Sequence, residues 1–193
     1  MLMLFMTTGA RRGEVCGLRR PRLDLHAGVV TYDRSTGQIA GSVWEKDVKT
    51  HQGRRVVLDP EMVETLRDHE LRSVGRAADL GIELDPGGYV FSPSPDASVP
   101  TKPDTVTQRY GRLVARLGID THLHSLRHYS ATELIAAGVD VRTVAGRLGH
   151  AGGGSTTLRT YAAFVQEADQ RAASALAARR TLLRPTSIKR AEQ

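Results

Sequence analysis

This sequence of 193 residues contains a single cysteine, few lysines and no long apolar run. One cysteine, Cys16, excludes an internal disulfide and is typical of a reducing compartment. No stretch reaches the roughly 18 apolar residues that a membrane span requires. The opening segment, residues 1–6, is too short for a signal peptide and has no basic region before it. We therefore expect a cytoplasmic protein with no membrane contact.

Acidic residues are scarce in the second half of the chain. Residues 1–100 contain 13 Lys/Arg and 14 Asp/Glu, whereas residues 101–193 contain 14 and 7. The net charge of +6 and the pI of about 9.9 indicate an anionic partner. A basic half is equally typical of a solvated helical surface, so charge alone leaves both interpretations open.

The apolar pattern predicts one core in an α+β fold that is mainly helical, with a small antiparallel sheet. The apolar run Met1–Met6 ends near Gly9, and glycine is typical of helix C-termini. A second short helix follows and stops at Pro21. Because the first run resembles the last turns of a core helix, we expect the start of the chain to be truncated.

Short β-rich segments are predicted between residues 28 and 58. Val29–Tyr32 and Ile39–Trp44 flank Ser35–Gly37, whose residues favour a turn. Arg55–Leu58 is a third candidate strand. Together these segments predict one small antiparallel sheet.

The remainder is predicted to be helical around one long loop. Asp59 and Pro60 are typical of a helix start, and apolar residues then recur at helical spacing: Met62, Val63, Leu66 and Leu71. Residues 85–103 are rich in Pro, Gly and Ser and predict a loop around the apolar residues 89–91. Further helices are predicted at about 104–117, 124–137, 140–149, 156–165 and 167–181.

Two motifs and a downstream tyrosine carry residues suited to phosphate chemistry. In His124-Ser125-Leu126-Arg127-His128, residues 124, 127 and 128 can share one helix face and form an anion site. Leu148-Gly149-His150 precedes Tyr161 by eleven residues, counted from the histidine. Taken alone, the first motif is also typical of a solvated basic face. Taken in isolation, His150 is equally typical of a satisfied helix-end histidine, and Tyr161 of a half-buried core aromatic.

Two upstream positions complete the candidate set. Arg11 and Glu14 lie three residues apart, so the carboxylate can hold the guanidinium in a fixed direction, although an exposed ion pair would have the same spacing. The chain has four lysines and 23 arginines. A lysine retained before a predicted strand, Lys49, suits a proton donor because arginine does not release its proton; Lys46 is a rival for this role.

Together these motifs resemble the tyrosine recombinase (phage integrase) family. The ordered set is Thr-Gly-Ala-Arg-Arg-Gly-Glu at residues 8–14, Lys-Thr at 49–50, His-Ser-Leu-Arg-His at 124–128, Leu-Gly-His at 148–150 and the downstream Tyr161. No single piece is specific, but all six catalytic positions occur in the family's order and at about its separations. The resemblance extends from residue 7 to about residue 180.

The resemblance implies a role for each residue in cutting and rejoining DNA through a covalent 3′-phosphotyrosyl intermediate. Arg11 and Arg127 would hold the scissile phosphate, and His124 and His150 would contact it or move protons. Lys49 would protonate the leaving 5′ oxygen, and Tyr161 would be the nucleophile. Glu14 and His128 would support this set from behind. The mechanism needs no cofactor and no metal, since the phosphotyrosine conserves the bond energy.

The resemblance also implies the integrase-like (DNA breaking-rejoining) fold of the catalytic domain, a domain plan and partners. Residues 1–181 would be the catalytic domain, without the N-terminal core-binding domain that relatives carry, and residues 182–193 a polar tail. The partner would be double-stranded DNA, bound by a homotetramer in a bacterial or phage setting. The helix after residue 167 would dock on a neighbour, although its apolar residues suit packing on the same chain equally: Ala172, Ala173, Leu176 and Ala177. Six arginines are candidates for contacts with the DNA backbone: Arg109, Arg112, Arg116, Arg142, Arg147 and Arg159.

Two features depart from the family pattern. Ala151–Gly154 lengthens the interval between His150 and the tyrosine, and Tyr161 is followed by Ala-Ala-Phe where many relatives have a histidine. Tyr110 and Tyr129 are poorer nucleophile candidates because of where they lie relative to the histidine–arginine motif.

Three alternative functions stay open at this point. A truncated, catalytically silent DNA-binding remnant would share every motif. Relaxation of DNA without recombination would indicate a relative of type IB topoisomerases. A metal-dependent nuclease would use histidines 122, 124, 128 and 150, although the carboxylates Asp120, Glu133 and Asp140 do not form a paired pattern.

Overall fold

The computed structural model describes residues 1–47, 53–150, 173–174 and 176–177. Its helices are α1 (Leu2–Thr8), α2 (Arg12–Cys16), α3 (Pro60–Asp79), α4 (Pro103–Arg116), α5 (Ser125–Ala136) and α6 (Val141–Leu148), with a 3₁₀ turn η1 (Arg20–Arg22). Its strands are β1 (Leu23–Asp24), β2 (Val29–Tyr32), β3 (Arg34–Ile39), β4 (Ser42–Asp47) and β5 (Arg54–Val57). The predicted helix at 156–165 and the tail after 181 lie outside the described residues, as does most of the predicted helix at 167–181, of which residues 173–174 and 176–177 are described and helical.

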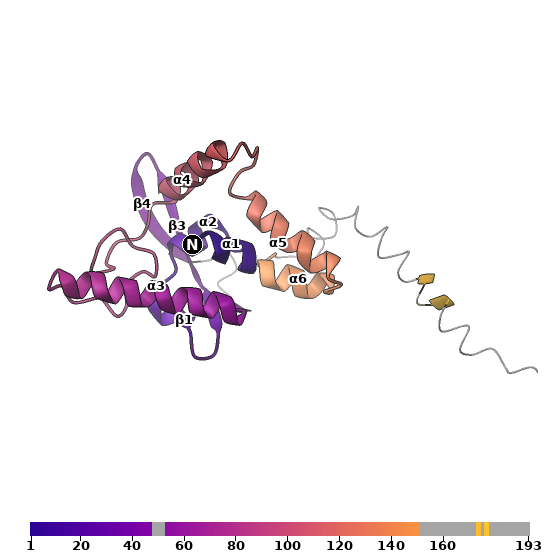
Figure 1. Ribbon diagram of the computed structural model, residues 1–193, viewed down its shortest axis with the longest axis horizontal. Helices are drawn as coiled ribbons and strands as arrows, with labels where there is room; N and C mark the ends of the chain where they lie inside the picture. Colours follow the sequence, from indigo (N-terminus) through magenta and orange to yellow (C-terminus); the bar gives the residue numbers. More distant parts are fainter. Residues whose placement is uncertain (48–52, 151–172, 175, 178–193) are drawn as a thin grey trace, which may run out of the picture.

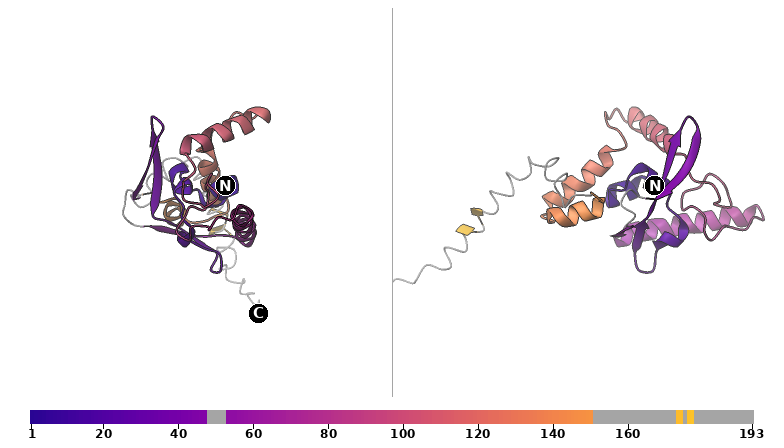
Figure 2. Two further views of the ribbon diagram at one scale, coloured as in Figure 1. Left: turned by 90° about the vertical axis from the view of Figure 1, so that its left-hand side faces the viewer. Right: turned by 180° about the vertical axis from the view of Figure 1, so that it is seen from behind.

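Helix α1 lies in the middle of the molecule and contacts α2, α3 and α5 (Figure 1). The long helix α3 runs along one side, and α4 lies on the opposite side beside the β3–β4 hairpin. Helices α5 and α6 pack on each other at one end, as the view from behind also shows (Figure 2). No helix within the described residues combines the length and the apolar composition needed to cross a membrane.

Two apolar clusters hold these elements together. The larger one joins α1, α2, α3, α4 and the β2–β5 pair, and Leu4, Val15, Val30 and Leu66 are among its most buried members. A smaller cluster between α5 and α6 contains Ala131, Val144 and Leu148. The α+β fold predicted from the sequence is therefore observed, with its helices packed around one main core.

Local sequence signals explain the helix ends. Asp59 caps α3 by accepting a 2.8 Å hydrogen bond from the backbone N–H of Met62, and Pro60 occupies the first turn. Gly9 and Gly149 end α1 and α6 in the left-handed conformation, at φ 61° and 67°. The predicted apolar face of α3 is only partly correct, because Leu71 is 68% exposed.

The turn was predicted at the wrong residues. Residues 35–37 lie within strand β3, and the turn is formed by Ala40 and Gly41, at φ 46° and 85°. Gly37 pairs with Trp44, and a Cβ at residue 37 would lie 2.6 Å from the indole ring. Gly37 therefore makes room for a cross-strand aromatic ring and does not form a turn.

The described strands also form two sheets where one was predicted. A three-stranded antiparallel sheet has the order β1-β2-β5, and β3 and β4 form a separate two-stranded ribbon. The short strand β1, which the sequence analysis missed, pairs Leu23 with Val30 and Asp24 with Val29.

Replacing Gly9 with alanine is expected to destabilise the fold through a direct overlap. A Cβ there would lie 2.3 Å from Cδ2 of Leu148, whose side chain is fully buried. Gly118 has a similar φ of 65° with no neighbour within 4 Å, so it provides a matched control. Urea unfolding should show a loss of about 1 kcal/mol for Gly118→Ala from backbone strain alone. Gly9→Ala should lose about 1–3 kcal/mol more from overpacking. Equal losses would contradict the tight contact.

Candidate active site

The loop after α1 positions Arg11 at the start of α2. Arg11 is the N-cap residue, and its backbone N–H donates to Oε2 of Glu14 at 2.7 Å. Its guanidinium Nη1 donates to Oε1 of the same carboxylate at 3.0 Å. The carboxylate is nearly fully buried, whereas the Arg11 side chain is 47% exposed. Glu14 therefore holds an arginine whose outer side reaches the surface.

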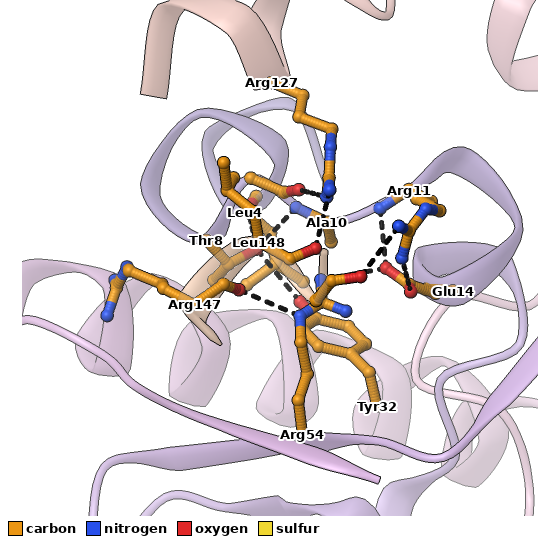
Figure 3. Close-up of polar contacts among 12 residues, drawn as sticks. Leu4, Thr8, Ala10, Arg11, Glu14, Tyr32, Arg54, Arg127, Arg147 and Leu148 are labelled. Carbon is orange, nitrogen blue, oxygen red and sulfur yellow. Dashed lines mark hydrogen bonds and ion pairs between the residues drawn. The ribbon is translucent and has the colours of Figure 1, made fainter. Parts of the chain in front are cut away.

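Helix α5 directs Arg127 into the interior, toward the ends of two other helices. Its guanidinium donates through Nη1 to the carbonyl of Gly9 and through Nη2 to the carbonyl of Leu148, the latter at 2.6 Å. Only 5% of the residue is exposed. Figure 3 shows this side chain pointing toward the α1–α2 loop and the end of α6. Arg127 thus joins the loop that carries Arg11 to the turn that carries His150.

The carboxyl end of α6 also binds Arg11. Nη2 of Arg11 donates to the carbonyl of Gly149 at 2.9 Å. Carbonyls at a helix C-terminus are favourable acceptors for cations, because the helix dipole is negative there. Two guanidiniums from distant parts of the chain therefore meet at one turn, residues 148–149.

Three histidines surround the two arginines. His124 is the N-cap residue of α5, and its ring packs edge-on against His128, with centroids 4.8 Å apart. Partial burial, followed by the charges of His128 and Arg127, lowers the pKa of His124. Burial, followed by the charges of Arg127, Arg11, Arg54 and His128, lowers the pKa of His150 to about 4. Both rings therefore lie in a positive electrostatic environment that favours their neutral form.

The structure thus brings together four of the six predicted catalytic residues, namely Arg11, His124, Arg127 and His150. Glu14 and His128 lie behind and beside them. The other two, Lys49 and Tyr161, lie outside the described residues. A hollow of about 280 Å³ opens beside this cluster, and Ala10, His124 and Arg127 are among the residues that line it.

The arginines predicted to contact the DNA backbone occupy different environments. Arg109, Arg112 and Arg116 on α4 and Arg142 on α6 are exposed. Arg147 is half-buried, and its Nη2 donates to the carbonyl of Thr7 at 2.8 Å. Arg159 lies outside the described residues. Of the six predicted arginines, the three on α4 and Arg142 on α6 are therefore exposed to solvent in the described part of the chain.

Sequence reasoning missed one arginine of this site, Arg54 on β5. Its Nη2 donates to Oε2 of Glu14 at 2.8 Å, and its Nε donates to the carbonyl of Arg147 at 2.9 Å. Residues 54 and 56 share the inner face of the strand, since Val56 is buried while Arg55 and Val57 are exposed. The sequence Arg54-Arg55-Val56-Val57 does not alternate between polar and apolar residues, so only the structure shows that Arg54 points inward.

The site gathers cations around a single buried carboxylate. Arg11 and Arg54 both bind Glu14, while Arg127 binds backbone carbonyls. Among residues 1–47 and 53–150, no three histidine, cysteine, aspartate or glutamate side chains are close enough to hold a metal ion. The arrangement is suited to binding an anion, because preorganised N–H donors and positive charge stabilise negative oxygens.

Comparison with known proteins agrees with this geometry. The model of the phage integrase family matches residues 1–167. The chain belongs to this family. It is 33% identical to transposase A of transposon Tn554 from Staphylococcus aureus, over 83% of this chain and 42% of that protein. It is 31% identical to the tyrosine recombinase XerD of Shewanella oneidensis, over 84% of this chain and 48% of that protein. The chain therefore spans less than half the length of these relatives.

Solved structures of integrases share the fold. The Tn1549 transposon integrase in complex with transposon right end DNA matches 89% of this chain and 57% of its own, with a TM-score of 0.71 and 20% identity. XerA recombinase matches 87% and 55%, with a TM-score of 0.63 and 24% identity. The integrase-like α+β fold expected from the sequence is confirmed.

Removing the shared carboxylate is expected to destabilise the protein more than removing an exposed one. Glu14→Ala leaves the buried guanidinium of Arg54 without its anionic partner, which should reduce the free energy of unfolding by about 3 kcal/mol. Glu64 also pairs with an arginine three residues away, but both side chains are exposed, so Glu64→Ala should cost about 0.5 kcal/mol or less. Urea unfolding of the two variants measures both, and similar losses would refute the buried pairing.

His150 is expected to titrate near pH 4 in the folded protein. The unfolded chain, with an ordinary histidine pKa of about 6.5, binds this proton first, so folding loses stability as the pH falls from 6.5 to 4. NMR titration of the ring, assigned with His150→Gln, measures the folded value, and the same titration in urea gives the reference. A folded value near 6.5 would contradict the burial of the ring beside these cations.

Proposed function

We propose that this chain is the catalytic domain of a site-specific DNA recombinase that cuts and rejoins strands through a 3′-phosphotyrosyl intermediate. The observation that carries the proposal is the convergence of Arg11, Arg127, His124 and His150 around the end of α6. Arg11 is separated from the other three residues by more than a hundred positions in the chain. The names of the relatives, which are recombinases, integrases and a transposase, support the same reading.

The proposed reaction is a transesterification at a DNA phosphodiester. The hydroxyl oxygen of Tyr161 attacks phosphorus, and the bond to the 5′ oxygen breaks. Lys49 gives a proton to this oxygen, since an alkoxide is a poor leaving group. The phosphate then remains esterified to Tyr161 until a new 5′ hydroxyl attacks and regenerates the DNA backbone. In cleavage the tyrosine proton passes to a neutral histidine of the site. In rejoining that histidine returns the proton to the tyrosine oxygen, and the new 5′ hydroxyl gives its proton to Lys49. Atoms and charge therefore balance, and the chemistry itself consumes no nucleoside triphosphate.

The described residues act on the phosphate. Negative charge spreads over its non-bridging oxygens during the attack, and the guanidiniums of Arg11 and Arg127 stabilise that charge in place. His124 and His150 are neutral near pH 7 in the protein without DNA, because their pKa values are lowered. A bound phosphate adds negative charge, which raises these pKa values and allows the rings to hold or move protons. The tyrosine, with an ordinary pKa near 10, needs such help to lose its proton.

Partners and setting follow as part of the same proposal. Double-stranded DNA is the substrate, and the exposed arginines of α4 and α6 contact its phosphates without reading sequence. A homotetramer assembles on two DNA sites inside a bacterial cell, in the cytoplasm. Residues 1–181 form the catalytic domain of this enzyme, and residues 182–193 are a polar tail.

A nicked suicide substrate tests the proposal, because loss of a short strand traps the covalent intermediate. The full chain should form a protein–DNA adduct that survives denaturation, and Tyr161→Phe should form none. Tyr129 is 48% exposed on α5, and Tyr129→Phe should keep the adduct. The adduct should form in EDTA.

No adduct at any DNA concentration would favour a binding remnant, and cleavage lost in EDTA would favour a metal-dependent nuclease. Relaxation of supercoiled DNA without strand exchange would favour a topoisomerase.

A further inference from the structure

Arg54 makes an unusual set of contacts for a strand arginine. Its side chain is 11% exposed, and its guanidinium carbon lies 4.7 Å from the centroid of the Tyr32 ring. One edge of the guanidinium donates to Glu14 and its Nε donates to the carbonyl of Arg147. Figure 3 shows Arg54 between these groups, with Tyr32 packed beside it. The cation is thus enclosed by a carboxylate, a carbonyl and an aromatic face.

These contacts connect the separate elements that carry the candidate catalytic groups. Glu14 lies on α2 and also binds Arg11, while Arg147 is three residues before His150 at the end of α6. The hydroxyl of Tyr32 lies 3.1 Å from Oγ1 of Thr8, the last residue of α1. Arg54 therefore sits where the sheet, α2 and α6 meet.

We propose that Arg54 is a positioning residue for strand cleavage: it fixes the Arg11 guanidinium through their shared carboxylate, and it fixes the turn of His150 through the carbonyl of Arg147. This inference rests on the proposed function for its kinetic consequence. Arg54 itself does not touch the reacting atoms. Its effect passes through Glu14 and the backbone of α6.

The geometry requires an arginine at this position. The planar guanidinium presents Nε–H and Nη–H groups in a fixed fork, so that one side chain reaches the carboxylate and the carbonyl together. The ammonium of lysine is a single point of charge on a flexible stem and cannot span both acceptors with the same orientation. Burial lowers the pKa of Arg54, while Glu14 and Tyr32 act in the opposite direction. A buried ion pair adds little net stability over apolar packing, so orientation is the effect that distinguishes it.

Single-turnover kinetics on the suicide substrate test this role in the full chain. At saturating DNA, Arg54→Lys should slow adduct formation about 100-fold, as expected for a small displacement of catalytic groups. The final adduct yield and the Kd for DNA should stay at the wild-type values. Arg55→Lys is the matched control, because Arg55 is the next residue on the strand and is exposed.

The rate constant separates positioning from a structural role. A merely structural residue would lower the melting temperature and the adduct yield while the folded fraction reacted at the wild-type rate, and that result would overturn the proposal. If Arg54→Lys also lowers the melting temperature, Glu14→Gln provides a second test, since it keeps the side-chain volume and weakens the shared acceptor. It must show the same slower rate constant for the proposal to stand.

A measurement without DNA keeps this proposal distinct from the proposed function. If the wild-type chain forms no adduct, the function fails, and the link between Arg54 and His150 is judged by NMR alone. After burial, the charges of Arg127, Arg11, Arg54 and His128 lower the pKa of His150, in that order. Arg54→Met removes one of them and should raise the pKa of His150 above about 4, whereas Arg55→Met should leave it unchanged. An unchanged value in Arg54→Met would overturn the link.

Discussion

The contact between the loop after α1 and the carboxyl end of α6 is the interaction on which the site depends. Gly9 packs against the buried side chain of Leu148 so closely that no Cβ fits between them. Arg127 then bridges the carbonyls of these same two residues. Because this contact joins residues about 140 positions apart, Arg11 and His150 become neighbours only when the whole fold has assembled.

Bringing several cations to one place is electrostatically unfavourable without compensating partners. The structure supplies them from behind: one nearly fully buried carboxylate, the carbonyls at the end of a helix, and the face of Tyr32. These partners fix the orientation of the guanidiniums and also offset the repulsion between them. Burial, and after it the charges of the same cations, lower the pKa values of His124 and His150. A phosphate is the kind of ligand that would relieve the repulsion between these cations, since it adds negative charge at the exposed side of the cluster.

The family assignment and this geometry describe the same region of the chain. The family model covers residues 1–167, and the described cluster draws on α1, α2, β5, α5 and α6 within that range. The exposed arginines of α4 and α6 lie on the outer surface, where a long polyanion could contact several of them at once. Arg54 and Arg127, by contrast, are buried, so their charge acts locally, at the candidate site.

Much of this protein follows from local sequence. Capping residues such as Asp59 and Gly9 fixed the helix ends, because they satisfy backbone groups within a few residues. The ordered motifs also identified one candidate set, because the order and spacing of residue types can be read directly from the sequence. The described members of this set are Arg11, Glu14, His124, Arg127 and His150. The position of the hairpin turn was predicted wrongly because Gly37 is required by the ring of Trp44 on the neighbouring strand. Local turn preferences contain no information about that cross-strand contact.

Tertiary structure alone decided which arginines are buried and which are exposed. The sequence presents 23 of them with the same chemistry, and it does not state which will be buried. Folding places Arg127 and Arg54 in the interior and leaves Arg11 half-exposed, because each position depends on acceptors contributed by distant elements. Local sequence determined which residue types and helix ends were available, since these depend on near neighbours. The fold determined which charges face one another, since that depends on how separate elements pack.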